Sequence, residues 1–255
     1  MNGLLATMRN ALAEAAAKRA ALLSAMTIMI VNDAVWVAFW VLFFHRVGHL
    51  HGWDSRRVLL LLSVMTSAAG ITLGLFSNAR RVGQMAVEGA LDAVLALPVQ
   101  PLPFLLVRRV EPVNIGDFAF GITLFCIVGH PTPVHIVVFA GVVLAASVLI
   151  TGFLVLTGSI AFFAGRGEGG ELGFHAILLL GSYPVDVFAG AAKVMLYTVV
   201  PAAFVSSIPA RLVLSFDPAR AAWLVGISAL FATAGTVAFT RGLRRYTSGA
   251  VWTRG

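Results

Sequence analysis

The sequence predicts an all-α integral membrane protein that crosses the bilayer six times. Of its 255 residues 59% are hydrophobic and 11% are charged, and the mean hydropathy is +0.93. An average soluble domain is about half apolar and about a quarter charged. A soluble fold of this length could not bury so much apolar surface. Residues 1–255 are therefore predicted to form one transmembrane domain.

Six stretches have the length and apolar character of a membrane crossing, which needs about 20 residues. The predicted crossings are residues 22–44, 58–77, 113–128, 134–164, 187–207 and 221–240.

The fifth of these crossings is the least regular, because prolines interrupt the segment 174–213. We expect an interfacial helix over 174–182 before it. A re-entrant or surface segment on the outer side is expected over 208–216 after it. Such breaks persist in lipid only where protein or a water-lined cavity satisfies the freed backbone groups.

Arginine placement predicts the orientation. With the N-terminus inside, 12 of the 18 lysines and arginines fall in inner segments, five fall in outer segments and Lys193 lies within a crossing. An excess of positive charge marks cytoplasmic segments. We therefore expect an amphipathic cytoplasmic helix over 1–21, a cytoplasmic loop over 78–112 and a cytoplasmic tail over 241–255. The net charge of +7 is attributed to topology and anionic lipid rather than to nucleic acid.

Polar residues at membrane depth are candidates for a translocation path or a subunit interface. Such groups are costly in lipid and usually face a bundle interior or a partner. The candidates are the polar residues Asn32, Asp33, Asp117, Lys193 and Tyr197, together with Pro201, which interrupts its segment. Local capping or pairing is the alternative. In particular, Asp186 and Lys193 would share one helix face at a spacing of seven residues.

The sequence lacks the motifs of several classes of enzyme and nucleotide-binding protein. No glycine-rich loop ends in Gly-Lys-Ser/Thr, no His-Glu-x-x-His is present, and no serine lies in a nucleophile elbow. Cys126 is the single cysteine, which excludes an internal disulfide. The glycine-rich segment 165–171 is interpreted as a flexible turn. We expect no catalytic residue, no metal site and no cofactor in this chain.

The segment between the second and third predicted crossings is too charged to span and too apolar for a linker. Its middle, residues 85–97, is predicted to form a short amphipathic helix that Pro98 ends. An ATPase could bind such a helix in a groove. The alternative is a helix that lies on the lipid headgroups.

This segment, Glu88-Gly89-x-Leu91-Asp92-x-x-Leu95-x-x-Pro98, resembles permease subunits of bacterial ABC transporters of the type-2, exporter-like class. Three further stretches carry the same resemblance. They are Gly181-Ser182-Tyr183-Pro184-Val185-Asp186, the run from Tyr197 to Ser206, and the ending Gly242-Leu243-Arg244-Arg245-Tyr246-x-Ser248-Gly249. The chain departs from the pattern at Leu97, where relatives often carry a basic residue.

The resemblance implies six helices, a cytoplasmic coupling helix and an outer re-entrant segment in a bacterial inner membrane. It implies two ATPase subunits, which hold the ATP and magnesium, and a second permease subunit, identical or related. The expected ATPase-coupling residues are Gln84, Val87, Glu88, Leu91, Asp92 and Leu95, with Glu88 and Asp92 facing the ATPase. An amphipathic small molecule, drug or lipid-like compound is the expected substrate.

Two other functions remain open on the sequence. One is a self-sufficient secondary transporter that uses Asp33 or Asp117 as a proton carrier. The other is a membrane enzyme or scaffold with a buried site. The substrate, the transport direction and the identity of the second permease are not encoded in any motif.

Overall fold

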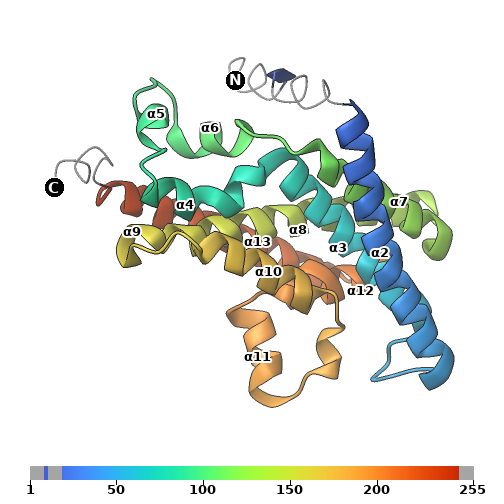
Figure 1. Ribbon diagram of the computed structural model, residues 1–255. Coiled ribbons are helices and arrows are strands. Elements are labelled where there is room, and N and C mark those ends of the chain that lie inside the picture. Colours follow the sequence, from blue (N-terminus) through green and yellow to red (C-terminus); the bar gives the residue numbers. More distant parts are fainter. Residues whose placement is uncertain (1–8, 11–18, 247–255) are drawn as a thin grey trace.

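A computed structural model of the chain describes residues 9–10 and 19–246 (Figure 1). This part is helical and contains no β-strand beyond the isolated bridge between Leu50 and Trp53. The predicted N-terminal helix over 1–21 and the tail beyond residue 246 fall almost entirely outside the described residues.

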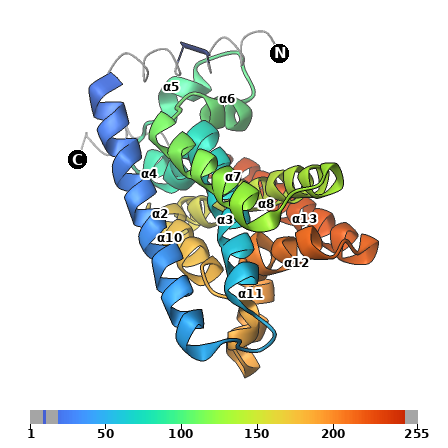
Figure 2. The same cartoon turned by 90° about the vertical axis from the view of Figure 1, so that its right-hand side faces the viewer.

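Within the described residues, five helices are long and apolar enough to cross a membrane. Their main helices are α2 (Arg19–Val47), α3 (Ser55–Phe76), α7 (Ile115–Gly129), α8 (Pro133–Ser159) and α13 (Pro218–Leu243). The span built on α7 reaches the necessary length only together with the short helix before it, over Pro112–Gly129. α3 is buried along most of its length, whereas most of the side chains of α2 are exposed. In the ribbon α2 lies at the edge of the bundle (Figure 2). The predicted all-α, multi-spanning fold is confirmed, and these helices correspond to crossings one, two, three, four and six.

Shorter helices connect and complete the bundle. After α3 come η1 (Ser77–Arg81), α4 (Val82–Val87), α5 (Asp92–Leu95), α6 (Pro101–Val107) and η2 (Pro112–Asn114). After α8 come α9 (Ala161–Ala164), α10 (Gly169–Gly181), η3 (Val185–Val187), α11 (Gly190–Thr198), η4 (Ala203–Ser207, a π-helical turn) and α12 (Ile208–Leu214).

Glycines set the distance between the long helices. A Cβ at Gly121 of α7 would lie 2.6 Å from the Ser63 carbonyl oxygen of α3. A Cβ at Gly235 of α13 would lie 2.5 Å from the Gly152 carbonyl oxygen of α8. Helices in membranes associate by such close backbone approach, since burial from water does not drive them together.

Replacing Gly235 by alanine is therefore expected to destabilise the bundle by about 1–3 kcal/mol, because the added methyl group overlaps the Gly152 backbone. Gly226 lies on the same helix with open space around its Cα, so Gly226→Ala is the matched control. Alanine there should be neutral or stabilising by up to about 1 kcal/mol. Thermal unfolding in detergent compares the two variants, and equal melting temperatures would show that the α8–α13 contact is not close-packed.

The helix expected over 174–182 is present as α10, but its bounds differ from the prediction. It begins earlier, at Gly169, and packs into the bundle, where Ile177 is fully buried. Glycines in the first turns of α10 account for this position, and two of them belong to the segment 165–171 that is predicted to be a flexible turn. A Cβ at Gly173 would lie 2.6 Å from the Thr157 hydroxyl of α8, and Gly169 and Gly170 approach the backbones of α8 and η1 even more closely. These glycines let α10 lie directly against α8.

The crossing predicted over 187–207 is not one straight helix. α11 and the η4–α12 segment are bent by 68° relative to each other, so they form either one broken span or a re-entrant loop. Pro201 has no N–H and lies at this break. Of the two alternatives expected for 208–216, a surface segment is wrong, because Pro209, Ala210, Leu212 and Val213 of α12 are buried, whereas a re-entrant segment remains compatible with the bend.

Contacts between distant segments define two ends of the bundle. At one end Arg80 approaches Glu171 at 3.6 Å, and Tyr246 donates a hydrogen bond to Asp92. At the other end Arg56 donates to the carbonyl oxygen of Val128, at the end of α7. The segments predicted to be cytoplasmic thus meet at one end, and those predicted to be outer meet at the other.

Candidate functional site

The segment between η1 and η2 forms a protruding loop at the first of these ends (Figure 1). The prediction of a single helix over 85–97 is wrong, because this segment contains two separate helices, α4 and α5. Between them Gly89 adopts φ +74°, a left-handed conformation that ends helices and that favours glycine. The loop therefore presents two short helices joined by a turn.

The exposed side of this loop combines apolar and polar side chains. Val87 is 52% exposed and Leu95 is 41% exposed, and Gln84 and Glu88 are exposed beside Val87. We call these four residues the loop surface. Leu91, by contrast, is 1% exposed and packs into the core, so it supports the loop from within. Exposed large apolar side chains on a loop of this kind are available for contact with a partner.

The two predicted coupling carboxylates have different surroundings. Glu88 accepts a hydrogen bond from Gln84 at 2.7 Å on the exposed side. Asp92 is half-buried and accepts a 2.8 Å hydrogen bond from the Tyr246 hydroxyl. Burial, together with the hydrogen bond and the charge of Asp92, raises the pKa of Tyr246 to about 12. Tyr246 therefore remains a donor at neutral pH and links Asp92 to the end of α13.

α4 is mounted firmly on the bundle. A Cβ at Gly83 would lie 2.6 Å from the Gly167 carbonyl oxygen and 2.8 Å from that of Gly158. Gly158 lies at the end of α8, and Gly167 lies just before α10. α4 is therefore in close contact with the end of α8 and with the segment that leads into α10, and close-packed contacts transmit strain.

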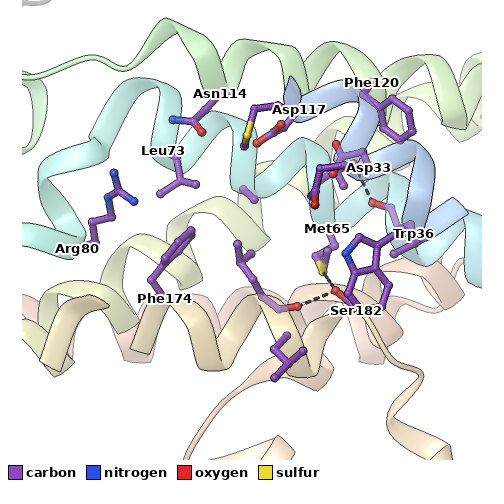
Figure 3. Close-up of a pocket in the computed structure, with 17 residues that line it drawn as sticks. Asp33, Trp36, Met65, Leu73, Arg80, Asn114, Asp117, Phe120, Phe174 and Ser182 are labelled. Carbon is purple, nitrogen blue, oxygen red and sulfur yellow. Dashed lines mark hydrogen bonds between the residues drawn. The ribbon is translucent and has the colours of Figure 1, made fainter. Parts of the chain in front are cut away.

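A cavity of about 320 Å³ lies between α2, α3, α7 and α10 (Figure 3). Asn32 and Asp33 line it from α2, and Asp117 lines it from α7. The structure thus brings together three predicted candidates that lie as many as 85 positions apart in the sequence. Its volume is within the usual range for small-molecule sites, about 300–1,000 Å³.

Neither aspartate has a compensating partner among the described residues. Asp117 is 6% exposed, and its Oδ1 has no hydrogen-bond partner. Oδ2 of Asp33 is also buried without a partner, and the two carboxyl groups are close enough to interact electrostatically. Both side chains point into the cavity (Figure 3). Buried carboxylates without partners are costly, which favours a functional explanation.

Arg80 lies at another part of the same cavity and was not predicted as a site residue. It pairs with Glu111 at 3.1 Å and approaches Glu171 at 3.6 Å, while Arg109 also pairs with Glu111 at 3.1 Å. The guanidinium of Arg80 also lies 5.4 Å from the ring centroid of Phe174. Two arginines and two glutamates thus balance each other. The sequence did offer one signal for these ion pairs, because Arg80, Glu111 and Glu171 all lie on segments predicted to be on the inner side.

The remaining candidates lie at the other end of the bundle. Lys193 pairs with Asp186 at 2.9 Å, but the shared helix face that was expected is wrong, because Asp186 lies in η3 and Lys193 in α11. Tyr197 packs edge-on against Phe204, with ring centroids 5.7 Å apart, and Pro201 is buried. None of these three predicted residues lines the Asp33–Asp117 cavity.

Asp186 is the centre of a cluster that includes the predicted pairing with Lys193 and two further residues, Arg211 and Trp53, that were not predicted. It also pairs with Arg211 of α12 and accepts a 3.0 Å hydrogen bond from the Trp53 indole nitrogen. Burial alone would raise the pKa of Asp186, but hydrogen bonds from Lys193 and Trp53 and the charge of Arg211 hold it below its ordinary 3.8. The cluster joins α11, α12 and the segment before α3.

The long apolar helices define a multi-pass α-helical membrane protein. It contains a polar cavity of a size that suits a small molecule, and a loop that packs closely against the helices at one end. A protein-family model described as "ABC-2 family transporter protein" matches residues 30–250. The chain therefore belongs to the ABC-2 family of transporter membrane proteins, as the sequence resemblance indicated. Comparison with curated proteins and with solved structures gave no match.

Proposed function

We propose that this chain is the permease subunit of an ATP-driven exporter whose ATP is bound and hydrolysed by a separate subunit. The observation that carries the proposal is the loop surface together with the close packing of α4, at Gly83, against Gly158 of α8 and Gly167 before α10. An apolar surface with adjacent carboxylates suits a groove on a soluble protein. Family membership supports this choice over lipid headgroups as the partner.

The proposed coupling begins when ATP closes the ATPase subunits and moves the loop surface. Gly83 is packed against the backbones of Gly158 and Gly167, so the movement reaches α8 and α10. α10 lines the Asp33–Asp117 cavity through Phe174, Leu178 and Ser182. Force applied at the loop would thus change the shape of the cavity. Such rigid-body shifts of packed helices are an established form of conformational switching.

The proposed assembly contains two permease subunits, alike or related, and two ATPase subunits, with the permease termini in the cytoplasm of a bacterial inner membrane. The substrate proposed from the resemblance is an amphipathic small molecule. The exposed length of α2 supports a partner subunit or lipid on that side, because most of its side chains lie outside the described core.

Affinity purification of the tagged chain from its native membranes tests this proposal. We expect an ATPase subunit to co-purify and the preparation to hydrolyse magnesium ATP in a vanadate-sensitive manner. The same purification of a Val87→Asp, Leu95→Asp variant should lose that hydrolysis. An intact chain that purifies without ATPase activity in a mild detergent would contradict the proposal.

The unpartnered carboxylates favour one other function, a proton-coupled secondary transporter. Protonation of Asp33 or Asp117 would remove a buried charge, as in proton relays of membrane proteins. Transport by this mechanism would stop when a protonophore collapses the proton gradient and would resist vanadate. Transport driven by ATP has the opposite inhibitor pattern.

A further inference from the structure

We propose that the cavity between α2, α3, α7 and α10 binds the positively charged group of an amphipathic organic cation. This inference rests on the proposed transport function and names its substrate class. The binding site itself is defined by the described residues of this chain.

The cavity carries two carboxyl groups that no cation of the described residues balances. Asp117 lines the cavity, is almost completely buried and has one oxygen without a hydrogen-bond partner, and Asp33 adds a second carboxylate to the lining. The nearby cation, Arg80, is already balanced by Glu111 and Glu171. The two aspartates therefore lack compensation, and a cationic ligand would supply it.

The rest of the cavity wall is largely aromatic and apolar. Trp36 and Phe120 contribute aromatic rings, and Met29 and Met65 contribute flexible apolar side chains. Aromatic rings attract organic cations, especially away from water. Methionine side chains adapt to ligands of irregular shape. A charged group beside the aspartates with an apolar body against these side chains fits both parts of the lining.

The same lining disfavours a metal ion. Calcium takes six to eight oxygen ligands, and magnesium requires near-octahedral oxygen coordination. The described residues contain no cluster of three or more acidic, histidine or cysteine side chains placed to hold a metal. An organic cation needs no such coordination sphere, since ion pairing and apolar contact suffice.

Equilibrium binding of radiolabelled tetraphenylphosphonium to the purified full-length chain in neutral detergent tests the proposal. We expect saturable binding to the wild type and at least about tenfold weaker binding to Asp117→Asn, since loss of a desolvated charge pair exceeds about 1.4 kcal/mol. Asp33→Asn should weaken binding in the same direction. Glu168→Gln, which neutralises an exposed carboxylate outside the cavity, is the matched control and should bind as the wild type does.

A competition experiment on the wild-type chain requires no variant to fold. Unlabelled tetraphenylphosphonium should displace the label, whereas neutral triphenylphosphine oxide of similar apolar character should not. Equal competition by the two compounds, or equal binding by the wild type and a folded Asp117→Asn variant, would overturn the proposal. Because binding requires no ATPase, absent binding in a chain that supports ATP-driven transport would overturn this inference alone.

Discussion

Replacing Val87 and Leu95 by aspartate is expected to reduce ATP-driven transport by at least about tenfold. Both side chains are exposed, so the variant should fold and insert normally. Introducing charge at an apolar anchor of a docked interface costs about 2 kcal/mol or more, and 1.4 kcal/mol corresponds to tenfold in binding. The measurement is ATP-dependent accumulation of amphipathic dyes in inside-out membrane vesicles.

The control is the apolar pair Val87→Leu, Leu95→Met, which preserves the character of the surface and should retain transport. Glu88→Arg tests the carboxylate at the same surface. Asp92→Arg is a less specific probe, because it also removes the acceptor of the Tyr246 hydroxyl. Transport at the wild-type level in the correctly inserted aspartate variant would show that the loop surface carries no coupling contact.

Replacing Asp186 by alanine is expected to destabilise the outer segment by about 1–3 kcal/mol. The substitution leaves Lys193, Arg211 and the Trp53 indole without their shared partner. Breaking a fully buried pair costs about 3–5 kcal/mol, but the two cationic side chains are about 40% exposed, so solvent screening lowers the value. Hydrogen exchange should therefore accelerate in residues 183–214 while that of α3 and α8 is unchanged.

The contribution of Asp186 also has a defined pH dependence. Its folded pKa lies below the ordinary 3.8, so the stabilisation is present above the unfolded pKa and is lost as pH falls through the folded pKa. The stability difference between wild type and Asp186→Ala should be full near pH 7 and vanish in strong acid. Thr198→Val, an isosteric change on exposed α11, is the control. A pH-independent difference would indicate that Asp186 acts through packing rather than charge.

The long crossings were predictable because each depends on local composition. Helices α2, α3, α7, α8 and α13 overlap the expected stretches, and the ends extend by a few residues where capping groups allow. Asp54 and Asp217, for example, accept backbone hydrogen bonds at the starts of α3 and α13. Hydropathy detects apolar length, but it does not detect caps.

The broken elements were harder to predict because their signals depend on packing. Gly89 divides the expected coupling helix through a left-handed turn, and Gly173 allows α10 to approach α8. Each glycine could equally have been part of a flexible loop. The bend between α11 and α12 lies at Pro201, which the sequence marks, but the pairing of Asp186 with both Lys193 of α11 and Arg211 of α12 is visible only in the fold.

The cavity shows the same division between local and tertiary information. Asp33 and Asp117 were each recognisable as unusual polar residues in apolar helices. Their convergence depends on α2 and α7 packing at one side of α3, which no local pattern encodes. Arg80 was identified as an inner basic residue, but its balance by Glu111 and Glu171 required the fold.

The inhibitor pattern of transport in inside-out vesicles is the most direct test of the proposed ATP-driven function. Vesicles that contain the chain and its co-purifying ATPase are supplied with magnesium ATP and a panel of amphipathic dyes. The account predicts dye accumulation that vanadate abolishes and that a protonophore leaves intact. Accumulation that resists vanadate and collapses with the protonophore would contradict it.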